Sequence, residues 1–126
     1  MALTKIVIGV LIGGVLALVG YGIYDYRQPG KLDGLAQCIK DSGAIFYGAF
    51  WCPHCQNQKK MFGKSDRLLP YVECSLPSGQ GQNQTCADKK IEGYPTWEFK
   101  DSTRATKVFS LGELAEKTAC PLPEPK

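Results

Sequence analysis

A long apolar segment opens the chain and differs in pattern from everything that follows. Residues 6–24, IVIGVLIGGVLALVGYGIY, hold nineteen consecutive positions without a charged side chain. A helix of that length is about 28 Å long, close to the hydrocarbon thickness of a bilayer. Aromatic residues suited to the membrane interface lie near its end, at Tyr21, Tyr24 and Tyr26. The pattern therefore predicts one transmembrane helix over residues 6–24.

A cleaved signal peptide is the alternative interpretation of this segment. The apolar part of such a peptide is usually about 7–15 residues long, and a cleavage site of the Ala-x-Ala kind follows it. Here the apolar run is longer, and Gly20 and Gly22 are a poor substitute for that site. We therefore expect an uncleaved anchor, with a flank of residues 1–5 before it and a linker of residues 25–31 after it.

Beyond the linker, the apolar residues follow helix spacing and then strand composition. Leu35, Cys38 and Ile39 recur three and four residues apart, which predicts a helix over residues 31–42. Residues 44–51, AIFYGAFW, are uncharged and rich in aromatic side chains, as expected of a buried strand.

A second helix is expected immediately after this strand. Pro53 follows Cys52 directly, and proline is favoured at the first position of a helix. The next residues, QNQKKMFGKS, continue with helix formers. Cys52 is therefore expected at a strand-to-helix junction, with Cys55 in the first helical turn.

The remaining elements are short. Ser110 and Glu113 form a capping box, which predicts where the last helix begins. The pattern predicts a strand over 69–74, a polar loop over 75–85, a helix over 86–91, strands over 96–99 and 106–109, a helix over 110–118 and an extended tail over 121–126.

This order of elements predicts the fold class. Strands that alternate with helices imply βαβ units and a sheet with helices on both faces, and the last two strands suggest an antiparallel hairpin. We therefore expect an α/β domain over residues 32–120, with a mixed sheet of about four strands flanked by helices.

Composition and charge exclude several function classes. The net charge is only +3, and the lysines and arginines are scattered, so no nucleic-acid interface is expected. No GxGxxG or P-loop motif occurs, and Gln56 follows Cys55 where a haem-attachment motif requires histidine. No cofactor is therefore expected.

All six cysteines lie after the apolar segment. An even number of cysteines behind an export-type helix argues for an oxidising compartment. The flanking charges do not determine which side of the membrane the domain lies on, since Lys5 precedes the apolar segment and Arg27 and Lys31 follow it. The cysteines lead us to expect a single-pass protein of the cell membrane, with its domain on the extracytoplasmic, periplasmic side.

The sequence Trp51-Cys52-Pro53-His54-Cys55 carries the candidate chemistry. Unpaired N–H groups at a helix N-terminus, a hydrogen bond from the Cys55 thiol and the nearby His54 would each favour a thiolate at Cys52. A more stable thiolate makes the disulfide more oxidising. We expect Cys52 to be the attacking, more exposed sulfur and Cys55 the buried, resolving one, with Trp51 beside the site.

The CPHC motif has two other interpretations. A zinc site would take ligands from the motif and from Cys74 or Cys86, but such sites usually have a second CxxC, and none exists. A helix that begins at a proline directly after an apolar strand is a poor setting for a disulfide with a purely structural role. A redox role is favoured, and no bound metal is expected.

Two motifs together give a first family resemblance. WCPHC after a hydrophobic strand, with Tyr94-Pro95-Thr96 some forty residues later, resembles the thioredoxin superfamily. Members of that superfamily carry a cis-proline opposite the CxxC, and Pro95 matches its position. The resemblance implies a thioredoxin-like fold and a substrate groove at Trp51, Tyr94 and Pro95.

A narrower resemblance rests on several segments in register. FYGAFWCPHC, LPYVEC, TCADKKIEGYPTWEF and SLGELAE resemble the thioredoxin-like domain fused to bacterial vitamin K epoxide reductase homologues. It implies a role similar to the DsbA type of periplasmic oxidase, with electrons passing from protein thiol substrates through the CxxC to a quinone-linked membrane reductase. This chain would correspond to the thioredoxin-like half of such a fusion, detached from the membrane reductase. Classical thioredoxins bury an acid where this chain has Phe46.

The resemblance also bears on the other four cysteines. Together with proximity in the sequence, it pairs Cys74 with Cys86. Cys38 and Cys120 would then be left for a bridge that clamps the ends of the domain. Many connectivities are open to six cysteines, and a redox relay through Cys74 and Cys86 is the alternative.

The sequence thus leads to a membrane-anchored, extracytoplasmic thiol–disulfide oxidoreductase that oxidises substrate thiols and is reoxidised by a membrane partner. A thiol–disulfide reductase of the cytochrome-maturation type is the alternative within the same class. A non-enzymatic binding module on a redox fold, or a zinc-bound scaffold, is the alternative outside it.

Overall fold

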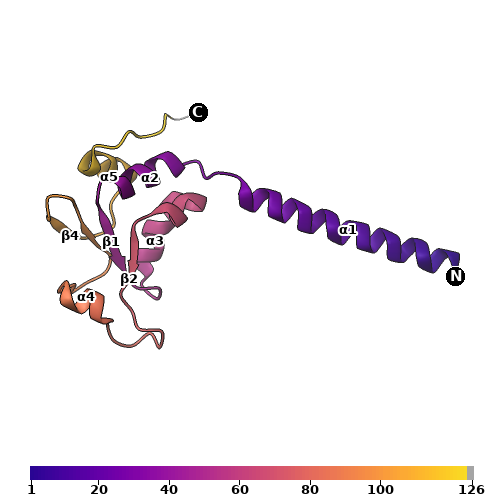
Figure 1. The fold of residues 1–126 in the computed structure, drawn as a ribbon, viewed down its shortest axis with the longest axis horizontal. Coiled ribbons are helices and arrows are strands. Elements are labelled where there is room, and N and C mark those ends of the chain that lie inside the picture. Colours follow the sequence, from indigo (N-terminus) through magenta and orange to yellow (C-terminus); the bar gives the residue numbers. More distant parts are fainter. Residues whose placement is uncertain (125–126) are drawn as a thin grey trace.

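An apolar helix extends away from a small α/β domain (Figure 1). The computed structural model describes residues 1–124, so residues 125–126 of the expected tail lie outside the described residues. Helix α1 runs from Ala2 to Arg27 and buries none of its residues in the domain. Its mean hydropathy reaches 2.5, so it is long and apolar enough to cross a membrane. It continues through the first residues of the expected linker.

Four strands form a mixed sheet in the order β2-β1-β3-β4. Strand β1 (Ile45–Gly48) pairs in parallel with β2 (Tyr71–Glu73) and antiparallel with β3 (Thr96–Glu98). Strand β4 (Arg104–Thr106) completes an antiparallel hairpin with β3. The mixed α/β fold class predicted from the sequence is confirmed.

The two faces of the sheet are covered unequally. Phe46 and Trp97 face a core formed with helices α2 (Asp33–Asp41), α3 (Pro53–Phe62) and α5 (Leu111–Thr118). Tyr47 lies on the opposite face, which is covered by the short helix α4 (Gln84–Asp88) and Ile91. A 3-10 helix, η1 (Gly63–Leu68), follows α3 and packs near α2.

One predicted strand was placed wrongly. Residues 106–109 were expected to form the last strand, but the strand lies earlier, at Arg104–Thr106. The backbone of Phe109 bonds to a side chain instead of a neighbouring strand. Its N–H donates to Gln58 Oε1 at 2.8 Å, and its carbonyl accepts from Gln58 Nε2 at 3.0 Å. Gln58 is fully buried, so it holds this segment against α3.

Two interactions that the sequence suggested are present in the last part of the domain. The capping box at α5 is present: Ser110 Oγ accepts from the Glu113 N–H at 3.2 Å, and the Ser110 N–H donates to Glu113 Oε2 at 2.8 Å. A disulfide joins Cys38 of α2 to Cys120, just beyond α5, with a Cα–Cα distance of 5.9 Å. The first and last helices of the domain are therefore linked covalently.

Candidate active site

The turn between β1 and α3 positions Cys52. The predicted strand over 44–51 already ends at Gly48, and the Cys52 N–H donates to the carbonyl of Ala49 at 3.0 Å. Pro53 occupies the first turn of α3, and Cys52 is the residue that caps this helix. Its Sγ accepts a hydrogen bond from the Cys55 N–H at 3.3 Å. The sulfur thus satisfies one of the N–H groups that a helix N-terminus leaves without an intrahelical partner.

The two thiols of the motif are both buried. Cys52 is 4% exposed and Cys55 is 1% exposed, so Cys52 is the more exposed of the two sulfurs, as expected, although both are buried. Cys52 is covered by a tertiary contact, because its Sγ lies 3.7 Å from the carbonyl oxygen of Tyr94, on a segment distant in sequence. Burial, and a hydrogen bond to Cys52, raise the pKa of Cys55 to about 12. The Cys55 thiol therefore stays protonated at neutral pH.

The residues expected to form a substrate groove lie beside Cys52. The Tyr94–Pro95 peptide bond is cis. Tyr94 and Pro95 line a surface pocket of about 360 Å³ that the exposed His54 also borders. Trp51 is not part of this pocket. It is 52% exposed, packs edge-to-face on Tyr94 at 6.0 Å, and donates from Nε1 to Ser75 Oγ at 3.0 Å.

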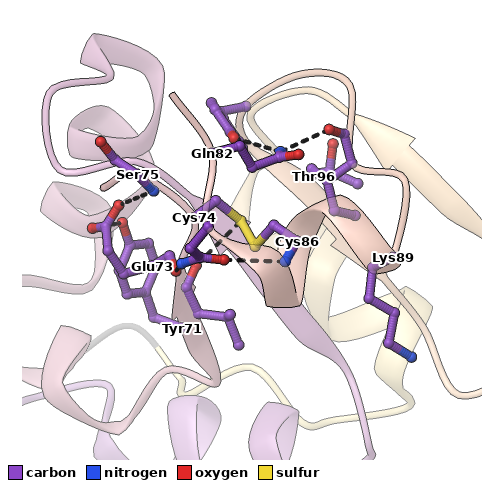
Figure 2. The surroundings of a disulfide bond; sticks show 12 residues. Tyr71, Glu73, Cys74, Ser75, Gln82, Cys86, Lys89 and Thr96 are labelled. Carbon is purple, nitrogen blue, oxygen red and sulfur yellow. Dashed lines mark hydrogen bonds between the residues drawn. A yellow bond between two sulfur atoms is a disulfide. The ribbon is translucent and has the colours of Figure 1, made fainter. Parts of the chain in front are cut away.

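A second disulfide supports the loop that flanks Trp51. Cys74, after β2, is bonded to Cys86 of α4, and both are fully buried (Figure 2). Asn83 caps α4 by accepting from the Cys86 N–H at 3.1 Å, and its Nδ2 donates to the carbonyl of Glu73 at 2.6 Å. Residues 75–83 are therefore fixed at both ends, close to the active site.

This bond also bears on the zinc interpretation. That site needed Cys74 or Cys86 as a ligand in addition to the CPHC motif, but these two cysteines are bonded to each other. Over residues 1–124, no group of three or more histidine, cysteine or acidic residues is placed to hold a metal ion.

Gly48 and Glu73 were not singled out from the sequence, and neither was a position of Tyr71 beside Cys55. Gly48 ends β1, and a Cβ added there would lie 2.7 Å from the Tyr71 ring and 3.0 Å from Cys55 Sγ. Tyr71 and Glu73 come from the neighbouring strand β2. A glycine inside an apolar strand signals a close approach, which was the one available sequence clue.

Replacing Gly48 by alanine is expected to destabilise the protein by about 1–3 kcal/mol, because the new methyl group overpacks the space between Tyr71 and Cys55. Urea unfolding measures this change. Gly34→Ala is the matched control, since its Cβ would meet nothing within 4 Å and alanine favours the α2 helix. Equal stability of the two variants would contradict the close packing beneath Cys55.

Comparison with known proteins gives a relative whose name bears on the function. The chain is 45% identical over 89 residues to the thiol-disulfide oxidoreductase LTO1 of Arabidopsis thaliana. The match covers 67% of this chain and 23% of the relative, so the chain spans about a quarter of that protein's length. No protein-family profile matches the chain. A homologue that is a thiol-disulfide oxidoreductase supports a redox function for this chain.

Proposed function

We propose that this protein is a membrane-anchored thiol–disulfide oxidoreductase that oxidises the thiols of extracytoplasmic proteins. One observation carries the proposal: Cys52 caps helix α3 with its sulfur, three residues before a buried second thiol. A hydrogen bond from a helix N-terminus is a contact that can stabilise a thiolate, the form in which a thiol exchanges with disulfides. The relationship to a named oxidoreductase supports the same class.

The reaction transfers two electrons. A substrate thiolate attacks Cys52 Sγ of the Cys52–Cys55 disulfide, and Cys55 leaves as a thiolate that takes up a proton. The second substrate thiolate then attacks the mixed disulfide and releases Cys52. The substrate gains a disulfide and CPHC becomes a dithiol. Stabilising the Cys52 thiolate favours this direction, because it stabilises the reduced form of the motif.

The membrane and the redox partner complete the proposal. Helix α1 anchors the chain as a single membrane span, and the two structural disulfides suit a domain on the oxidising side of that membrane. Reoxidation passes the two electrons to a quinone-linked membrane protein, of the kind represented by vitamin K epoxide reductase homologues. The substrate segment that carries the thiols binds in extended form beside Tyr94 and Pro95.

Disulfide transfer tests the proposal. The full chain in detergent, with CPHC oxidised, is mixed with a reduced and unfolded secreted protein, and free thiols are counted on both. We expect each CPHC disulfide consumed to appear as a disulfide in the substrate. Unchanged thiol counts on both proteins would contradict the function.

Protease protection tests the topology. Protease added to intact spheroplasts is expected to remove residues 32–120 and leave the anchor. Digestion that occurs only after the membrane is broken would contradict the extracytoplasmic placement.

A further inference from the structure

Cys55 has to lose a proton before it can bond to Cys52, and burial opposes that loss. Its pKa is raised to about 12, chiefly because the thiolate would be poorly solvated. Phe46 occupies the position at which classical thioredoxins bury an acid. Phe46 is fully buried and stacks on Trp97 with ring centroids 4.7 Å apart, so no acid reaches Cys55 from β1.

A hydroxyl group from the next strand reaches the space beside Cys55. The Cβ position of Gly48 lies 3.0 Å from Cys55 Sγ and 3.3 Å from the Tyr71 hydroxyl oxygen. Both groups therefore border the small space that the missing side chain of Gly48 leaves. The register of the sheet fixes this arrangement, because Tyr71 pairs with Phe46, and Gly48 pairs with Glu73.

The same hydroxyl is bonded to a carboxylate. Tyr71 donates to Glu73 Oε2 at 2.8 Å. The other oxygen, Oε1, accepts from the N–H group of Ser75 at 2.9 Å (Figure 2). It also accepts from the N–H group of Phe50 at 3.2 Å. Glu73 is half-buried, so its carboxylate is held in place while it keeps access to solvent. The chain thus has an anchored acceptor, bonded to a hydroxyl that borders the same space as the buried thiol.

Lys59 and burial influence the protonation of the Cys55 thiol and the Tyr71 hydroxyl. The Lys59 Nζ lies 3.4 Å from the centroid of the Tyr71 ring, and its charge acts to lower the pKa of Cys55. Burial, followed by the bond to Glu73, raises the pKa of Tyr71 well above its usual range. The hydroxyl therefore stays protonated, and it passes a proton only when it receives one at the same time.

We infer that Tyr71 and Glu73 form the proton path of Cys55. This inference rests on the proposed function and adds residues to its site. When Cys52 is in a mixed disulfide, the Cys55 proton moves to the Tyr71 oxygen and the Tyr71 proton moves to Glu73. Cys55 Sγ then bonds to Cys52 Sγ, the bond from Cys52 to the partner sulfur breaks, and that sulfur leaves as a thiolate. Glu73 finally releases the proton to solvent.

The path serves both directions of electron flow. The reverse reaction returns a proton to Cys55 through the same atoms. The charged and titratable groups that act on this site are Cys52 and Lys59 from α3 and its cap, and Tyr71 and Glu73 from β2. The core residues facing it from β1 and β3, Phe46 and Trp97, carry no charge.

Stopped-flow kinetics of the full chain, with CPHC reduced, test the inference. Dithionitrobenzoate is an aromatic disulfide that releases a coloured thiolate. Attack by Cys52 gives a first phase that depends on reagent concentration, and attack by Cys55 on the mixed disulfide gives a second phase that does not. The variants are Glu73→Gln, which keeps the acceptor oxygen for Phe50 and Ser75, and Tyr71→Phe, which keeps the ring. Glu116→Gln, on an exposed part of α5, is the charge-matched control.

We expect both variants to slow the second phase by about ten-fold or more near pH 6, because general base assistance is lost. The difference should narrow as the pH rises and hydroxide replaces the carboxylate, while the first phase and the control stay unchanged. A second phase with the same pH profile in all proteins, or equal slowing of both phases, would overturn the inference. If the unsubstituted protein has no second phase, the proposed function fails as well, which separates the two failures.

Discussion

Replacing Cys52 by serine is expected to lower the rate of thiol–disulfide exchange by about a thousand-fold or more. The reason is chemical, because a serine hydroxyl does not ionise near neutral pH and forms no disulfide. The fold should survive, since serine also accepts a hydrogen bond from the Cys55 N–H at the start of α3. Disulfide transfer to a reduced, unfolded protein measures the loss.

Cys55→Ser is the matched control for this prediction. It keeps the attacking sulfur and removes the resolving one, so reaction with a disulfide substrate should stop at a mixed disulfide on Cys52. That species is detected as a covalent adduct that disappears with reductant. Unchanged exchange by Cys52→Ser, with no adduct on Cys55→Ser, would favour a binding module over an enzyme.

The second large effect concerns stability. Replacing Cys38 and Cys120 together by alanine is expected to destabilise the domain by about 4–5 kcal/mol. The bond closes a loop with a sequence separation of 82, so its removal releases much chain entropy in the unfolded state. Such a loss is a large share of the stability of a domain of this size. Urea unfolding of the full chain in detergent measures it.

The comparison for this prediction is the other structural disulfide. Cys74 and Cys86 are only 12 residues apart, so the same model gives about 3 kcal/mol for their replacement by alanine. The order of the two effects is the informative result. A smaller loss for Cys38 and Cys120 than for Cys74 and Cys86 would show that the long-range clamp contributes little to the folded domain.

Local signals made much of the fold predictable. Pro53 after an apolar strand predicted the start of α3, and Ser110 with Glu113 predicted the cap of α5, because both signals act within a few residues. The mixed sheet followed from the order of its elements. These features depend on neighbours in the sequence, so a single sequence was sufficient to predict them.

Contacts between distant segments accounted for what was missed. The last strand was misplaced because Gln58, about fifty residues away, bonds to the backbone of Phe109. The contact that covers Cys52 comes from Tyr94, a residue distant in the sequence. Tyr71 borders the same space as Cys55 only through the parallel register of β1 and β2, which no periodicity in a single strand reveals.

The reduction potential of the Cys52–Cys55 pair tests the central claim most directly. The full chain in detergent is equilibrated with glutathione redox buffers, and the fraction of oxidised CPHC is measured. An oxidase should give a value near or above that of disulfide isomerases, about −180 mV, because the reduced form is stabilised at the α3 N-terminus. A value near that of thioredoxin, about −270 mV, would contradict the oxidase and mean a reductase.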